Sequence, residues 1–287
     1  MRAHIPSYSL VSAANLPEAL GLLAGEPGFW QPFAGGTDLM VLLEAGKLPH
    51  KNYLNLWNVG ELRGIAVADK HITLGALTTY TEVQSHPVLQ KEFPMLCQAA
   101  SETGGLAIQN RGTLGGNIVN ASPAADSPPA LLAYNAEVEL LSVRGSRWIP
   151  YGDFHTGYKQ TVMQPDELLA GIRLPRLWPD LQHYYRKVGT RKAQAISKIC
   201  LAATARMSDQ TVDLVRIALG SVAPVPLRCR KTENVLQGAV LDEDVIAKAK
   251  AELSREIVPI DDIRSTKDYR LQVSLNVLED FLRQLVA

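Results

Sequence analysis

The sequence predicts an α+β fold, and three observations favour this class. Apolar residues make up 46% of the 287 residues and charged residues 20%, which is typical of ordinary globular proteins. Up to Pro175 the apolar period changes repeatedly between two residues and three to four residues, so strands and helices are mixed. In the rest of the chain, strand patterns come first and helical patterns follow, an order typical of α+β folds.

The first part of the chain carries clear start signals for its elements. Asn15 can cap a helix that has proline in its first turn. From Ile65 the period changes to two and predicts a β-hairpin. Residues 79–101 are mostly helical but interrupted at two prolines. The other expected elements are strands at 30–34, 53–56, 137–143 and 167–174, a helix at 39–45 closed by Gly46, and a helix with Ser127 as N-cap.

The segment PRLWP, from Pro175 to Pro179, marks the expected domain boundary. We expect a domain of residues 1–176, with subdomains of about 1–57 and 58–176, followed by a C-terminal domain of residues 177–287. The C-terminal domain is predicted to hold a three-stranded sheet and two helices. Its expected strands are 183–188, 199–206 and 212–219, and its expected helices are about 242–253 and 265–285, the second with leucines at three-and-four spacing.

Two glycine-rich stretches are the candidate functional segments. Residues 112–126 read GTLGGNIVNASPAAD, and residues 31–39 read QPFAGGTDL. Paired glycines allow φ > 0, as we expect at Gly116, and let a ligand approach bare backbone N–H groups. A surface loop rich in turn-forming residues explains either stretch alone equally well. Two such loops in one chain favour a phosphate or pyrophosphate clamped between them. We expect residues 112–126 to form no regular amphipathic helix and no alternating strand.

Several function classes are excluded. The formal net charge is zero, with 29 basic and 29 acidic residues and no basic patch, which argues against nucleic acid. The chain has no G-x-G-x-x-G, no P-loop, no hydrolase motif and no metal-ligand spacing among its six histidines and three cysteines. No run is long and apolar enough for a membrane span, and the N-terminus resembles no secretory signal. We therefore expect a cytoplasmic protein without catalytic residues or metal ligands of its own.

Two charged groups have open interpretations. Asp126 either accepts hydrogen bonds from the hydroxyls of a ligand's ribose or favours the N-terminus of the helix that follows it, and the two roles are compatible. The run from Arg186 to Lys192 is either a solvated hairpin or a source of one cation facing a ligand at the domain boundary.

Over essentially its whole length the chain resembles the FAD-binding subunit of the molybdenum hydroxylases, the group of xanthine dehydrogenase, aldehyde oxidoreductases and carbon monoxide dehydrogenase. Ala34-Gly35-Gly36-Thr37-Asp38 is similar to the first pyrophosphate loop of that family, and Thr113-Leu114-Gly115-Gly116-Asn117 to the second. Ala121-Ser122-Pro123 with Asp126, Asp-Glu-Leu-Leu at 166–169 and Lys187-x-x-x-Arg191 continue the likeness. Gln194 departs from it, because relatives carry an acid there.

The resemblance implies a two-subdomain fold of the vanillyl-alcohol-oxidase (PCMH) type and an FAD site. Phe33 to Leu39 would wrap the pyrophosphate, with Thr113, Gly116 and Asn117 on its other side. Asp126 would face the ribose and adenine, and Lys187 the polar edge of the flavin ring. The implied cofactor-binding residues are Gln31, Pro32, Phe33, Ala34, Gly35, Gly36, Thr37, Asp38, Leu39, Thr113, Leu114, Gly115, Gly116, Asn117, Asp126, Leu168, Leu169 and Lys187, the two leucines lying near the isoalloxazine.

The resemblance also implies partners. Electrons would arrive from a molybdenum-cofactor subunit through the [2Fe-2S] clusters of an iron–sulfur subunit, in a heterotrimer, and leave FAD for NAD or another acceptor. Two alternatives remain open. One is a stand-alone flavin oxidoreductase with its own substrate pocket, and the other is a cofactor-less structural subunit of the same fold.

Overall fold

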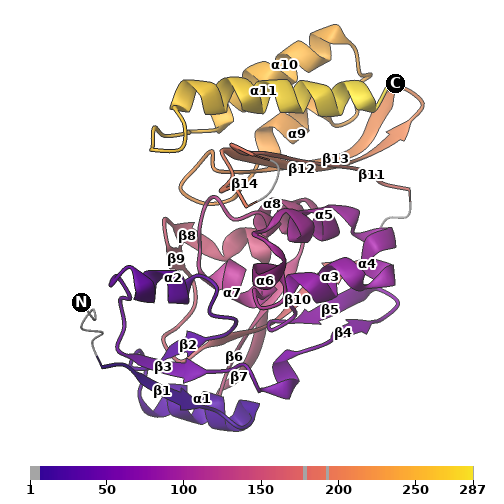
Figure 1. Cartoon of the computed structure of the whole chain (residues 1–287). Coiled ribbons are helices and arrows are strands. Elements are labelled where there is room, and N and C mark those ends of the chain that lie inside the picture. The colour runs from indigo at the N-terminus through magenta and orange to yellow at the C-terminus, as the bar shows by residue number, and fades with distance from the viewer. Residues whose placement is uncertain (1–6, 177–179, 192–193, 287) are drawn as a thin grey trace.

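The computed structural model describes residues 7–176, 180–191 and 194–286. These residues form three main sheets that follow one another along the molecule, each with helices packed against it (Figure 1). The predicted α+β class is confirmed. The expected boundary at Pro175–Pro179 falls partly on residues 177–179, which lie outside the described residues. No described helix is both long enough and apolar enough to cross a membrane.

The N-terminal sheet is parallel, with strand order β1-β3-β2. Its strands are β1 (Ser9–Ser12), β2 (Gln31–Phe33) and β3 (Asn52–Asn55). Helix α1 (Leu16–Gly25) begins as predicted, because the Asn15 side chain accepts from the backbone N–H of Glu18. Helix α2 (Leu39–Glu44) follows the first glycine loop, and the 3₁₀ helix η1 (Gly60–Leu62) leads to the next sheet.

The middle sheet is antiparallel, with strand order β4-β5-β10-β6-β7. Its strands are β4 (Ile65–Val67), β5 (His71–Gly75), β6 (Glu137–Ser142), β7 (Gly145–Pro150) and β10 (Leu168–Pro175). One face is covered by α3 (Tyr80–Ser85), α4 (Pro87–Glu92), α5 (Pro94–Glu102), α6 (Leu106–Gln109), α7 (Leu114–Val119) and α8 (Ser127–Ala133). The 3₁₀ helix η2 (Tyr151–Asp153) leads to a small hairpin of β8 (His155–Gly157) and β9 (Gln160–Thr161).

The C-terminal sheet is antiparallel, with strand order β11-β12-β13-β14. Its strands are β11 (Gln182–Val188), β12 (Ile199–Ser208), β13 (Thr211–Gly220) and β14 (Leu227–Arg228). Residues that alternate along strand β12 are buried on opposite faces of this sheet. Leu201 and Ala203 pack under α9 (Arg230–Leu236), α10 (Glu243–Glu256) and α11 (Lys267–Gln284), whereas Cys200 and Ala202 join the core of the middle unit.

The structure corrects several expectations. The C-terminal sheet has four strands where three were predicted, and α9 precedes the two expected helices. Strands β1 and β7 were not anticipated. Ser127 is the first residue of α8, so Asp126 occupies the N-cap position, where its side chain makes no capping hydrogen bond. The three helical pieces predicted over 79–101 are confirmed as α3, α4 and α5.

Candidate functional site

The first glycine loop leaves β2 and enters α2, and its backbone donors are free. Gln31, Pro32 and Phe33 form β2, and Leu39 begins α2. Between them, the backbone N–H groups of residues 34–39 donate to no acceptor among the described residues. Gly36 has φ +77°, a conformation that glycine adopts without strain. A row of free N–H groups around such a residue is a ready-made anion site.

Gly35 holds this loop against the second glycine-rich stretch. A Cβ on Gly35 would lie 1.8 Å from the backbone oxygen of Arg111 and 3.3 Å from the backbone nitrogen of Gly112. The two loops therefore touch through bare backbone. This contact explains why a residue without a side chain stands at position 35, and it confirms that the two stretches lie side by side.

The second stretch contains a short helix, α7, in its first half, where no regular helix was predicted. Thr113 caps it: its hydroxyl oxygen accepts from the N–H of Gly116 at 3.1 Å. The N–H groups of Leu114 and Gly115 donate to Thr78 O and Ala76 O. These donors are already used, and Gly116 is helical, so the expectation of φ > 0 there is wrong.

The surface that α7 offers a ligand comes from few of its residues. Leu114 and Gly115 are buried in the core, whereas Gly116 is exposed and Asn117 partly exposed. Asn117 Oδ1 is nevertheless buried and has no hydrogen-bond partner among the described residues. A buried polar atom without a partner carries a free-energy cost that a ligand donor would remove.

Asp126 and Lys187 form an ion pair across the domain boundary. Lys187 Nζ donates to Asp126 Oδ2 and to the backbone oxygen of Glu102, each at 2.8 Å. Both side chains are almost fully buried. Burial raises the pKa of Asp126 to about 6, although the charge of Lys187 opposes the rise. Asp126 Oδ1 has no partner among the described residues.

The roles expected for the two residues, Asp126 at the ribose and adenine and Lys187 at the polar edge of the flavin ring, stay predictions. Those two parts of FAD are separated by a ribitol and a pyrophosphate, whereas the two side chains are in direct contact.

Leu168 and Leu169 open β10 and are 2% and 5% exposed. Leu168 belongs to the core of the N-terminal unit and Leu169 to the core of the middle unit. Their side chains have almost no free surface and pack within these two cores. Their expected place near the isoalloxazine stays a prediction.

Three cations near the loops were missed. Arg111 stacks on Trp57, with its guanidinium carbon 3.7 Å from the ring centroid, and Arg63 stacks on the same ring at 4.4 Å. Lys159, in the β8–β9 turn, donates to Asn120 at the end of α7. Arg111 directly precedes the second glycine-rich stretch, which was a usable signal, whereas nothing in the local pattern around Lys159 pointed to the site.

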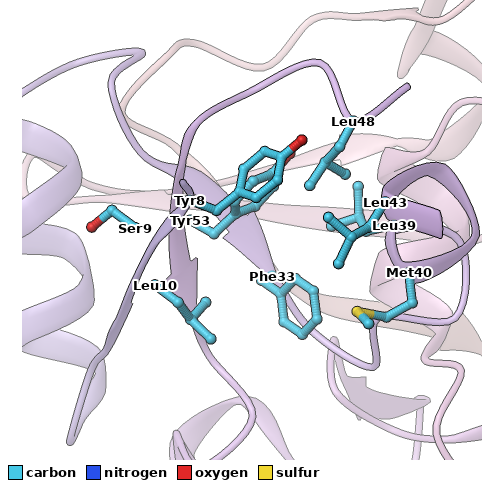
Figure 2. A pocket seen from close by; sticks show the side chains of 9 residues that line it. All are labelled: Tyr8, Ser9, Leu10, Phe33, Leu39, Met40, Leu43, Leu48 and Tyr53. Carbon is cyan, nitrogen blue, oxygen red and sulfur yellow. The ribbon is translucent and has the colours of Figure 1, made fainter. Parts of the chain in front are cut away.

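An apolar cavity of about 130 Å³ lies beside the first loop, between β1 and α2 (Figure 2). Phe33 points into it, facing Leu39 and Met40 of α2, and Tyr8 and Tyr53 close the opposite side. Its walls are mostly apolar and suit no phosphate group. The free N–H groups of the loop remain the better phosphate site.

The described residues contain no cluster of three or more histidine, cysteine or acidic side chains able to hold a metal ion. Cys97, Cys200 and Cys229 are free thiols. The Cys200 and Cys229 side chains are buried, and burial raises their thiol pKa values.

Known proteins are similar to this chain in both sequence and architecture. Residues 6–177 match the family described as FAD binding domain in molybdopterin dehydrogenase, and residues 183–285 match the CO dehydrogenase flavoprotein C-terminal domain. The xanthine dehydrogenase FAD-binding subunit of Escherichia coli O157:H7 is 32% identical over 280 residues, which cover 96% of this chain and 94% of the relative. The chain belongs to the family of FAD-binding domains of molybdopterin dehydrogenases.

Other proteins are similar to this chain over most of their length. The glyceraldehyde dehydrogenase medium chain of Sulfolobus acidocaldarius is 31% identical over 268 residues, covering 93% of this chain and 94% of the relative. The structure of carbon monoxide dehydrogenase from Hydrogenophaga pseudoflava that lacks the Mo-pyranopterin moiety superposes with a TM-score of 0.92 at 26% identity, covering 96% of each chain. The resemblance inferred from the sequence is confirmed.

The residues of this family member fit an FAD cofactor. The backbone N–H groups of residues 34–39, which have no acceptor among the described residues, suit a pyrophosphate. The close backbone contact of Gly35 with Arg111 holds the two loops together. Asn117 Oδ1 and Asp126 Oδ1 have no hydrogen-bond partner among the described residues. They suit hydrogen bonds from the hydroxyl groups of a ribityl chain or a ribose, or from a flavin N–H group. The structure thus provides both the phosphate donors and the polar acceptors that the cofactor needs.

Proposed function

We propose that this chain is the FAD-carrying electron-transfer subunit of a molybdenum hydroxylase complex. In this role it takes electrons from the [2Fe-2S] clusters of an iron–sulfur subunit, which are reduced by a molybdenum-cofactor subunit, and delivers them to NAD or another acceptor. The observation that carries the proposal is the row of six free backbone N–H groups at residues 34–39, placed against the start of α7. Backbone donors of this kind bind a pyrophosphate without needing a general positive charge.

Bound FAD supplies one- and two-electron redox chemistry, which links one-electron clusters to a two-electron acceptor. The chain's own residues would bind the cofactor and orient it. Residues 34–39 would hold the pyrophosphate, and Asn117 would accept a hydrogen bond from the cofactor. Asp126 and Lys187 would stand together at one end of it, as a buried ion pair that also joins the C-terminal domain to the FAD domain.

The other expected site residues stay part of the proposal. Thr113 contributes by capping α7, and the buried residues Leu114, Gly115, Leu168 and Leu169 contribute by packing under the site. The finer parts of the proposal are xanthine as the substrate of the complex, NAD as the electron acceptor, a heterotrimeric assembly and a cytoplasmic location. The relatives named above act in complexes on different substrates, so the organic substrate is left to experiment.

A stand-alone flavin oxidoreductase is the second candidate, and a cofactor-less subunit is the third. The free N–H groups speak against a chain without cofactor, since no described residue of the fold uses them.

Three measurements on the purified chain and its complex test the proposal. The chain alone should bind one FAD, show a flavin absorption spectrum and contain neither molybdenum nor iron. It should oxidise no purine or aldehyde, whereas the complex isolated through a tag on this chain should contain both metals and oxidise its substrate. Turnover of an organic substrate by the chain alone would favour the stand-alone enzyme, and failure to bind FAD would favour the cofactor-less subunit.

A further inference from the structure

Lys159 occupies an unusual position at the tip of the β8–β9 hairpin. Its φ of +56° lies in the left-handed region, which non-glycine residues enter infrequently and at a cost. The turn between Gly157 and Gln160 thereby aims this side chain across to α7. In Figure 1 the hairpin, α2 and α7 are close neighbours.

The ammonium group of Lys159 is held by hydrogen bonds, but no carboxylate among the described residues forms a salt bridge with it. It donates to the backbone oxygen of Asn120 at 2.8 Å and to Asn120 Oδ1 at 2.6 Å. Desolvation lowers its pKa and the charge of Asp38 opposes this, although the residue as a whole stays exposed. It forms no salt bridge within the described residues. An ammonium has three N–H donors, so one is left beside the two hydrogen bonds to Asn120.

These contacts place Lys159 near the ends of both the first glycine loop and α7. At one end the loop meets the start of α7 through Gly35 and Arg111. At the other end Lys159 lies between Asp38, which ends the loop, and Asn120, which ends the helix. The free N–H groups of residues 34–39 lie between these two ends.

We propose that Lys159 binds the pyrophosphate of the cofactor, as a cation that the β8–β9 hairpin brings to the first glycine loop and α7. The inference rests on the proposed FAD site. A pyrophosphate carries two negative charges, whereas the loop supplies backbone N–H dipoles and, at Asp38, one more negative charge. A charged donor fixed on Asn120 adds a strong hydrogen bond, and its side chain is already ordered before the ligand arrives.

The test is FAD binding to the full-length apoprotein, measured by flavin fluorescence quenching and, separately, by thermal melting without ligand. Lys159→Met removes the charge, Lys159→Arg keeps it, and Lys70→Met removes an exposed lysine in the β4–β5 turn as a matched control. We expect Lys159→Met to raise the Kd for FAD by about tenfold in 0.05 M salt, the size of one charge-assisted hydrogen bond discounted for exposure. Lys159→Arg and Lys70→Met should stay within about threefold of wild type.

Salt dependence separates this role from a purely structural one. Because ions screen a charge contact, the ratio between Lys159→Met and wild type should fall toward one at about 0.5 M salt. A ratio near one already at low salt would overturn the inference. A ratio above one that does not change with salt, together with a lower melting temperature of the apoprotein, would overturn the inference. It would show that Lys159 acts only structurally, through its hydrogen bonds to Asn120. If wild type itself bound no FAD, the proposed function would fail first and the inference with it.

Discussion

Replacing Gly35 by alanine should separate the two segments that form the phosphate site. The alanine Cβ would start 1.8 Å from the Arg111 oxygen, whereas real Cβ contacts are essentially never shorter than 3.0 Å. Gly35 does not have a positive φ, so the backbone conformation itself tolerates alanine. The gap must open by more than an ångström, and since both contacting groups are backbone, a whole segment has to move.

The expected magnitude follows from the donors that this shift displaces. Each hydrogen bond to a charged phosphate oxygen is worth roughly 1.5–3 kcal/mol, so misplacing two of them raises the Kd for FAD by roughly a hundredfold or more. Overpacking of this kind costs about 1–3 kcal/mol of folding stability, which lowers the melting temperature by only a few degrees. The variant should therefore be folded but nearly colourless.

Fluorescence titration with FAD and a thermal melt of the apoprotein measure the two effects separately. Gly21→Ala is the matched control, because its Cβ would meet nothing within 4 Å and it lies inside α1. It should bind FAD normally and be slightly more stable, as expected for alanine in a helix. The reasoning is refuted if Gly35→Ala binds FAD with wild-type affinity.

Three further variants probe the surroundings of the site. Lys187→Met leaves the buried Asp126 carboxylate without its cation and should lower the free energy of unfolding in urea by about 3–5 kcal/mol; adding Asp126→Asn should restore part of it, and no restoration would argue against the pair. Thr113→Val removes the N-cap acceptor of α7 and should cost about 1 kcal/mol of stability, whereas Thr113→Ser should cost little. Burial lowers the pKa of His155 to about 4 from 6.5. The unfolded state then binds the proton more readily, so stability should be complete above pH 6.5 and fall by about 3 kcal/mol toward pH 4. His155→Gln should flatten this slope, and an unchanged slope would assign the acid sensitivity elsewhere.

Elements with a period or a cap of their own were predictable from the sequence. The Asn15 cap, the three helical pieces over 79–101 and the strands of the C-terminal sheet up to β13 follow from local patterns. Strand β7 was missed because it is an edge strand with mostly exposed or half-buried residues and no clear alternation. The two residues of β14 are too few for any pattern.

Helix α7 shows where local reasoning fails. Glycine-rich residues favour no helix by themselves, because glycine is among the poorest helix formers. Here the helix is held from outside: Thr78 and Ala76 accept two of its first N–H groups, and Gly115 packs directly on Ala76, where a Cβ would lie 2.7 Å from the Ala76 oxygen. Its second glycine, Gly116, is exposed and gives the ligand side of the helix a surface without side chains. Gly115 thus allows close approach of the helix to Ala76 through packing and not through positive φ, whereas the approach of a ligand to Gly116 stays a prediction.

The two glycine loops therefore differ in kind although their sequences look alike. The first keeps its N–H groups free and can bind phosphate through the backbone, whereas the second uses its N–H groups for folding and offers only side-chain atoms and a bare helical surface. The same difference explains the Asp126–Lys187 pair. The two residues are 61 positions apart, and they meet where β11 packs against α5 and where β12 and β13 pack against α8. Assigning each residue its own part of the cofactor treats the two residues as independent, whereas in the structure they form one buried ion pair. We therefore propose that a contact of either residue with FAD would place the other near the same part of the cofactor.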